Sequence, residues 1–174
     1  MSETFRARPV SRKDIRNYVY SLKKLFGLET ERYFPILPFV ENVLPHLFPE
    51  YLFEVVPAQE MGNKHGETFP SYKLIRIRED VYEGAARENG RDRFTIAHEV
   101  GHLLLHSEKD ISLCRIYPSI KLKAYEDPEW QANAFGGELL ASSWLISGMS
   151  AAQVSQECAV SFSAAEIQLR TLLK

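Results

Sequence analysis

The chain has 174 residues, of which 45% are hydrophobic and 25% are charged, and its formal net charge is −2 at pH 7. These values are typical of a globular protein large enough for one hydrophobic core, and they give no general case for nucleic-acid binding. No apolar run approaches the ~20 residues of a membrane span, and the N-terminus carries charges where a signal peptide is apolar. We therefore expect one soluble, cytoplasmic domain over residues 1–174, with no direct nucleic-acid or membrane partner.

Cysteine usage agrees with that location. Cys114 and Cys158 are the only cysteines, and they lack the C-x-x-C spacing of a redox or metal motif. We expect two reduced, buried thiols and no disulfide framework.

The first predicted element is an amphipathic helix within residues 1–28. Ser11 followed by Asp14 resembles a capping box, and Gly27 is well placed to end the helix. The apolar face is formed by Ile15, Tyr18, Leu22 and Leu25. The first 24 residues contain seven basic and two acidic side chains, so another face is basic. A solvated surface is the favoured interpretation of that face, and contact with an acidic partner or DNA is the alternative.

The next segment is interrupted by prolines and then becomes rich in aromatic and β-branched residues. Pro38 is expected to open a short helix, which Pro45 would kink. Tyr51–Val56 predicts a strand, and the polar stretch Ala58–Ser71 predicts a loop or hairpin connection after it.

A second strand is predicted at Tyr72–Arg78, because apolar and basic residues partly alternate over Leu74–Arg78. The outer edge of this strand could pair with an extended peptide. A helical turn at Asp80–Arg87 and a tight turn at Asn89-Gly90 are expected to lead into the next helix.

The stretch Thr95–His106 reads T-I-A-H-E-V-G-H-L-L-L-H and has apolar residues at helical spacing. His98 and His102 are four residues apart, so on a helix they project from the same side. With Glu99, this H-E-x-x-H arrangement can place two imidazole nitrogens on one zinc ion and a carboxylate beside the open position, where a water binds. Glu99 would take a proton from that water and return it to a leaving group.

An ordinary core helix with satisfied histidines is the alternative explanation. Gly101 would cost such a helix about 1 kcal/mol relative to alanine, so its presence suggests that another element packs very close. His106 lies four residues beyond His102, but about 12 Å of helix rise separates it from His98, too far for the three to share one ion. We expect His106 to be a helix C-terminal residue that the helix dipole favours.

A third metal ligand would come from downstream, where the candidates are Glu126, Asp127, Glu129 and Glu138. Asp127 and Pro128 predict a helix start, as N-cap and first helical residue. Glu129 then lies in the first turn, where the dipole favours the ionised carboxylate that a metal needs. A plain N-terminal helix glutamate explains this residue equally well. Asn133 could hydrogen-bond a ligating histidine, whereas Glu138 is expected to face solvent.

Two motifs together carry a family resemblance. R-F-T-I-A-H-E-V-G-H-L-L-L-H, followed downstream by E-W-Q-A-N-A-F-G-G-E-L-L, resembles the ImmA/IrrE family of zinc metalloendopeptidases over roughly Leu74–Leu140. The resemblance implies an α+β fold of the minimal zincin type: a small mixed or antiparallel sheet packed on the H-E-x-x-H helix, a second helix crossing beneath it, and further helices at both ends. It implies His98, His102 and Glu129 as zinc ligands and Glu99 as the general base.

The resemblance also implies a function. Proteases of this kind are typically encoded beside an Xre-type helix-turn-helix repressor and inactivate it by cleavage, in mobile elements or stress responses. We therefore expect a zinc-dependent endopeptidase whose substrate is a regulator encoded nearby. The alternative is a toxin- or antitoxin-type binding protein that retains the zinc site but acts by sequestering a regulator.

One departure from the family pattern concerns the end of the second helix. Ala141-Ser142 stands where Met-Pro normally follows Leu-Leu, so without that proline the helix is expected to run on through Trp144. In the tail, residues 150–174, we expect two capped helices, one near Ser150–Cys158 and one that opens at Ser163.

Overall fold

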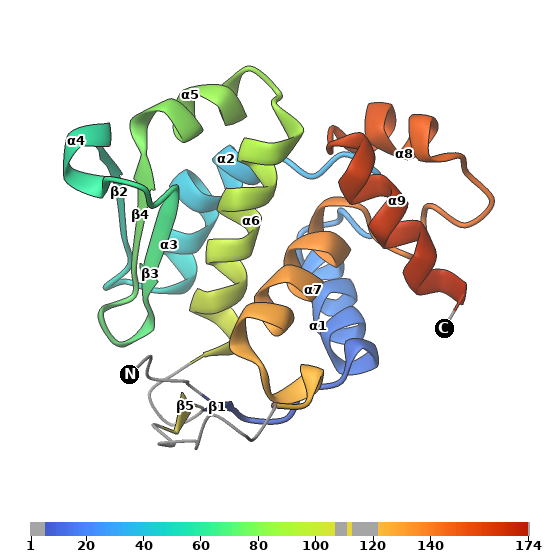
Figure 1. Ribbon diagram of the computed structural model, residues 1–174, viewed down its shortest axis with the longest axis horizontal. Coiled ribbons are helices and arrows are strands. Elements are labelled where there is room, and N and C mark those ends of the chain that lie inside the picture. Colours follow the sequence, from blue (N-terminus) through green and yellow to red (C-terminus); the bar gives the residue numbers. More distant parts are fainter. Residues whose placement is uncertain (1–5, 107–110, 113–121, 174) are drawn as a thin grey trace.

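Helix α6 (Gly90–Leu105) runs through the middle of the molecule, between the sheet on one side and helix α7 (Pro128–Leu140) on the other (Figure 1). The computed structural model describes residues 6–106, 111–112 and 122–173. Helix α1 lies behind α7 in this view, and the helices near the C-terminus pack beyond it. Within the described residues, no helix combines the length and apolar character that a membrane span needs.

The remaining elements are short. The strands are β1 (Arg6–Ala7), β2 (Leu52–Val56), β3 (Gly66–Phe69), β4 (Leu74–Arg78) and β5 (Ile111–Ser112). The other helices are α1 (Arg12–Leu25), α2 (Ile36–Pro38), the π-helix Phe39–Val43, α3 (Leu44–Leu47), α4 (Ala58–Met61), α5 (Glu79–Ala86), α8 (Ala151–Cys158) and α9 (Phe162–Arg170), with short 3-10 turns at Pro70–Tyr72, Ala124–Glu126 and Thr171–Leu173.

The main sheet of the described residues is mixed, with the order β2-β4-β3. β2 runs parallel to β4, and β3 runs antiparallel to it. Ile75 and Ile77 point into the core and are fully buried, as their alternation with basic residues predicts. The mixed sheet against the H-E-x-x-H helix confirms the α+β fold.

Two expectations about this sheet are wrong. Ala58–Ser71 is not only a connection, because it contains α4 and the strand β3. Consequently β4 is the central strand, and Leu74–Arg78 offers no free edge to a peptide. The sequence of β3, G-E-T-F, has too little hydrophobic alternation to mark a strand, and its pairing with β4 is a tertiary contact that local sequence does not reveal.

The proline-rich segment forms one nearly continuous helical stretch that begins at Ile36, two residues before the expected start at Pro38. Its middle is π-helical, and the amide of Leu44 donates to the carbonyl of Phe39, five residues earlier. Pro45 has no N–H to donate to the preceding turn, so the altered hydrogen bonding coincides with this proline.

Helix α1 begins as predicted. The Ser11 hydroxyl accepts from the amide of Asp14, and the Asp14 carboxylate accepts from the amide of Ser11. Gly27 follows the helix with φ of 68°, a left-handed conformation that favours glycine. Both ends of this helix are therefore fixed by local sequence.

The basic face of α1 is less solvated than predicted. Lys23 is fully buried and donates to the carbonyl of Glu31 (2.7 Å) and the hydroxyl of Ser142 (2.9 Å). Burial lowers the pKa of this ammonium to about 8. Arg16 lies 3.3 Å from the carboxylate of Glu138 on α7. The basic residues thus attach α1 to α7 as well as facing water.

Glu138 is also buried, contrary to the expectation that it faces solvent. Besides Arg16, its carboxylate accepts from the amide (3.1 Å) and hydroxyl (2.7 Å) of Ser143. These bonds require the chain to turn back after Leu140, so α7 ends there and does not run on through Trp144. Ser143 provides the stop that the absent proline would have given.

The C-terminal helices follow the prediction with one shift. α8 is capped by Ser150, with Gln153 completing the capping box. α9 begins two residues earlier than expected, because the Ser161 hydroxyl, not that of Ser163, accepts from the amide of Ala164. Cys158 at the end of α8 is a buried free thiol, as predicted, whereas Cys114 lies outside the described residues.

Gly101 lies where α7 crosses α6, and the close approach predicted for it is confirmed. A Cβ added to Gly101 would lie 3.1 Å from both the Cα and the carbonyl oxygen of Ala132, and 3.2 Å from the Cβ of Phe135. On the other helix, a Cβ on Gly136 would lie 3.3 Å from the amide nitrogen of His98. The two backbones are therefore in nearly direct contact.

Replacing Gly101 by valine should destabilise the protein, because the crossing backbone of α7 cannot yield as a side chain would. Overpacking of this kind costs about 1–3 kcal/mol, and urea denaturation measures it. Ala86→Val in α5 is the control, since Ala86 is exposed and the added methyl groups meet solvent instead of a crossing helix. Equal stability of the two variants would contradict the close crossing.

Candidate metal centre

Helix α6 carries the two histidines, and its start is fixed by Asn89. The Asn89 side chain accepts from the amides of Arg91 (3.0 Å) and Asp92 (3.3 Å), which makes it the N-cap. The expected tight turn at Asn89-Gly90 is therefore a helix cap, since α6 begins at Gly90. With its start fixed, the helix places His98 and His102 one above the other.

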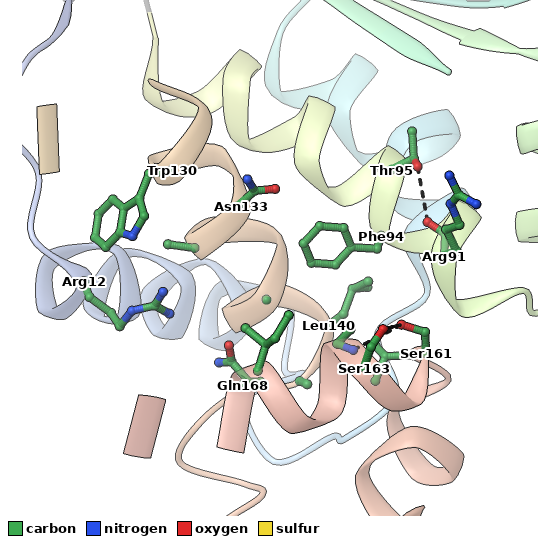
Figure 2. A pocket seen from close by; sticks show the side chains of 16 residues that line it. Arg12, Arg91, Phe94, Thr95, Trp130, Asn133, Leu140, Ser161, Ser163 and Gln168 are labelled. Atoms are coloured by element: carbon green, nitrogen blue, oxygen red, sulfur yellow. Dashed lines mark hydrogen bonds between the residues drawn. The ribbon is translucent and has the colours of Figure 1, made fainter. Parts of the chain in front are cut away.

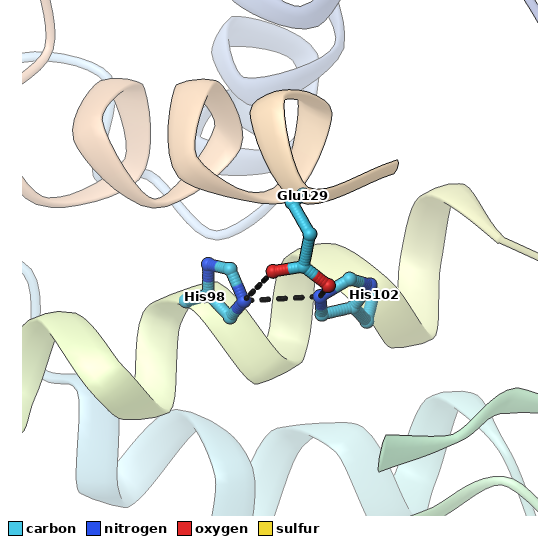
Figure 3. A group of neighbouring side chains, drawn as sticks. All are labelled: His98, His102 and Glu129. Carbon is cyan, nitrogen blue, oxygen red and sulfur yellow. Dashed lines mark hydrogen bonds and ion pairs between the residues drawn. The ribbon is translucent and has the colours of Figure 1, made fainter. Parts of the chain in front are cut away.

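The structure brings three of the predicted site residues to one point (Figure 3). The Nε2 atoms of His98 and His102 lie 3.0 Å apart. The Glu129 carboxylate, from the first turn of α7, lies 3.3 Å from each of them, through Oε2 and Oε1 respectively. As predicted, Asp127 caps α7 by accepting from the amide of Glu129 (2.9 Å). The other candidates, Glu126, Asp127 and Glu138, are outside this group. Among the described residues, no other cluster of three histidine, cysteine or acidic side chains could hold a metal ion.

Each histidine uses its second ring nitrogen to contact a neighbour. His98 Nδ1 lies 2.9 Å from Asn133 Oδ1, the partner that the sequence predicted one turn after Glu129. Because that oxygen accepts, Nδ1 carries the proton and Nε2 of a neutral His98 is a bare lone pair. This tautomer is the one that binds a metal through Nε2.

Electrostatics at the group favour a positive charge. Hydrogen bonds that His102 and His98 donate to Glu129 when their rings are protonated on Nε2 hold the pKa of the Glu129 carboxyl well below its usual range. Burial lowers the pKa of His98, but the hydrogen bond to Glu129 and the charges of Glu99 and Glu129 outweigh it and leave the pKa raised. Three electron-pair donors that converge within 4.8 Å repel one another unless a cation lies among them. Two imidazoles and one carboxylate fit a divalent transition metal.

Glu99 lies on the side of α6 that faces β3 and is largely buried. Its Oε2 accepts from the Thr68 hydroxyl at 2.6 Å. A Cβ added to Gly66, also on β3, would lie 3.0 Å from Oε1 of Glu99, so the absence of a side chain there leaves room for the carboxylate. The strand missed in the sequence therefore positions the predicted base.

His106 has a larger role than the sequence suggested. It is the C-cap of α6, as expected, but it is fully buried. Its Nδ1 lies 3.0 Å from His102 Nδ1, and its Nε2 lies 2.9 Å from Gln131 Oε1. The four-residue spacing from His102 was the available signal for this contact. Nothing in the local sequence of Gln131 or Thr68 marks either residue.

A pocket of about 570 Å³ lies between α6, α7 and α9, and His98, His102 and Glu129 are not among the residues that line it (Figure 2). Thr95 lines it one turn before His98, and Asn133 lines it one turn after Glu129. Phe94, Trp130 and Leu140 give it apolar walls.

Comparison with models of known protein families finds a match. The family model of the IrrE N-terminal-like domain, Peptidase_M78, matches residues 55–169, which include all of β3, β4, α6 and α7. No curated protein matches the chain. The match covers most of the sequence, and metal dependence of these peptidases agrees with the donor group at the α6–α7 crossing. The chain belongs to the ImmA/IrrE family and is a metallopeptidase of that type.

Proposed function

We propose that this protein is a cytoplasmic zinc-dependent endopeptidase, with His98, His102 and Glu129 as zinc ligands and Glu99 as general base. The observation that carries the proposal is the convergence of two Nε2 atoms and a carboxylate at mutual distances of 3.0–3.3 Å. Two histidines and a glutamate are a ligand set of catalytic zinc, which leaves one position open. A zinc ion bound by these three residues would act as a Lewis acid toward a water molecule and the scissile carbonyl.

The chain's own contribution to the chemistry comes from Glu99. Glu99 directly follows the proposed ligand His98 in the sequence, and its carboxylate accepts a hydrogen bond from the Thr68 hydroxyl. From that position it accepts a proton as water attacks the carbonyl carbon, and it later donates the proton to the amine that leaves. Burial by β3 protects the carboxylate from bulk water, so its orientation is set before a substrate arrives.

The substrate is a protein segment bound in extended form along β3. β3 is paired on one side with β4 and carries, on Thr68, the contact to Glu99. Backbone hydrogen bonds to such a strand bind a peptide with little dependence on its sequence, and pockets for alternate side chains add selectivity. A helix-turn-helix regulator encoded near this gene is the substrate we propose, by analogy with the family.

The experiment is co-expression of this chain with the regulator encoded beside its gene, together with metal analysis of the purified protein. We expect close to one zinc per chain, and cleavage of the regulator that a chelator stops and added zinc restores. A folded sample without bound metal would contradict the proposal. Stable complex formation without cleavage would instead support the alternative, a protein that sequesters its regulator.

A further inference from the structure

The second histidine of the group is connected to two backbone carbonyls through a buried chain of side chains. We propose that this relay, from His102 through His106 and Gln131 to the carbonyls of Arg8 and Tyr125, sets the tautomer in which His102 presents Nε2 to the metal. His106 and Gln131 are thus positioning residues for a ligand. This inference depends on one part of the proposed function, which is that His102 is a metal ligand.

The argument begins at Gln131, which is fully buried on α7. Its side-chain nitrogen lies 2.8 Å from the carbonyl oxygen of Arg8 and 2.8 Å from that of Tyr125. Both carbonyls can only accept, so the amide must direct its NH₂ group toward them. The two bonds use both N–H donors of the amide and fix its orientation.

The orientation of Gln131 determines the protonation of His106. With its nitrogen held by the two carbonyls, Gln131 presents Oε1 to His106 Nε2 at 2.9 Å. An amide oxygen can only accept, so His106 carries its proton on Nε2. The Nδ1 atom of a neutral His106 is then a lone pair.

The protonation of His106 in turn determines the tautomer of His102. His106 Nδ1 lies 3.0 Å from His102 Nδ1, and one of these two atoms must donate. Because Nδ1 of His106 is the acceptor, His102 carries its proton on Nδ1 and has a bare Nε2. That Nε2 is the atom directed toward His98 and Glu129. Every link of the relay therefore points the lone pair of His102 at the metal position.

His98 and His102 differ in the hydrogen-bond partners that fix their tautomers. The Nδ1 atom of His98 depends on one partner, Asn133, which is exposed. His102 depends on two fully buried side chains, His106 and Gln131, and the relay ends at Arg8, in the segment before α1. That segment lies outside the family match, which begins at residue 55. It is held there also by the amide of Val10, which donates to the carbonyl of Tyr125 at 2.9 Å. The N-terminal segment thus contributes to a site that the family motif alone does not complete.

Zinc affinity of the metal-free protein tests the relay. Competition with a chromophoric chelator should show binding weakened about 10- to 100-fold in Gln131→Leu and in His106→Phe, the usual effect of losing a ligand's hydrogen-bond partner. Gln168→Leu is the matched control, because Gln168 is a buried glutamine on α9 whose Nε2 has no hydrogen-bond partner among the residues that the structure describes. Circular dichroism checks that each variant is folded. Folded Gln131→Leu and His106→Phe variants with affinities equal to the control would overturn the proposal.

A second measurement on the unmodified chain remains valid if a variant fails to fold. Nitrogen-15 NMR of the imidazole rings, at a pH where both are neutral, should show protons on Nδ1 of His102 and Nε2 of His106. The opposite tautomer at either ring would overturn the relay. Unmodified protein with the expected tautomers that does not bind zinc would contradict the proposed function, while the hydrogen-bond assignment would stand.

Discussion

We expect the replacement of Glu99 by glutamine to lower the rate of peptide-bond cleavage by about 10²- to 10⁴-fold, the usual contribution of a general base, and to leave the amount of bound zinc unchanged. Glutamine keeps the size of the side chain and can still accept from Thr68, but it cannot take a proton from water. Comparison of kcat/KM and zinc content for the two proteins measures the effect. The loss of activity should appear in kcat, because Glu99 takes the proton from water in the transition state and not when the substrate binds.

Glu157→Gln is the matched control, since Glu157 is a glutamate on α8 that forms an ion pair with Arg32. This variant should retain full activity and zinc. A Glu99→Gln protein that cleaves as fast as the unmodified chain would show that Glu99 is not the base. Where the unmodified chain only binds its regulator and the substitution leaves that binding intact, sequestration is the activity.

Zinc should raise the free energy of unfolding by about 4 kcal/mol when its free concentration is a thousand times its Kd, because it binds the folded chain in preference to the unfolded one. For a chain of this length, that gain corresponds to a rise in Tm of roughly 8–16 °C. The reason lies in the structure: His98 and His102 are on α6 and Glu129 is on α7, so the ion would join the two helices at their crossing.

Thermal unfolding with and without zinc measures the zinc increment, which is the rise in Tm that zinc causes, in each variant. His102→Ala should lose most of it, because the remaining donors are one imidazole and one carboxylate. His46→Ala is the control, since His46 is exposed on α3 and away from the group. The increment is compared within each protein, so any direct effect of a substitution on stability cancels. An equal zinc increment in His102→Ala and in the unmodified chain would contradict the assigned ligands.

Local sequence was sufficient where a structural feature is determined by neighbouring residues. The starts of α1 and α7 depend on side chains that bond to amides two or three residues away, so Ser11 and Asp127 reveal them. The H-E-x-x-H spacing places two histidines on one side of a helix for the same reason. Gly101 was informative because a glycine within a helix needs a cause, and the cause is the backbone of α7.

Features that depend on distant pairing were missed. Glu138 was expected in solvent, because its partners Arg16 and Arg12 are more than a hundred residues away and no local pattern shows that their charges compensate its burial. The strand β3 was missed because its order comes from β4 and not from its own hydrophobicity. The metal-site residues Thr68 and Gln131 belong to the same class, since each is defined by what lies opposite it in the fold.

The position of β3 has a consequence for chemical inhibition. Gly66–Phe69 pairs with β4 along one side, and no other strand of the described residues pairs along its second side. An extended peptidomimetic could therefore join the sheet at β3 and bring a metal-chelating group, such as a hydroxamate, toward His98 and His102. Resistance through Gly66 is constrained, because any side chain at this position would collide with Glu99. A substitution there that repels the inhibitor would also displace the proposed base.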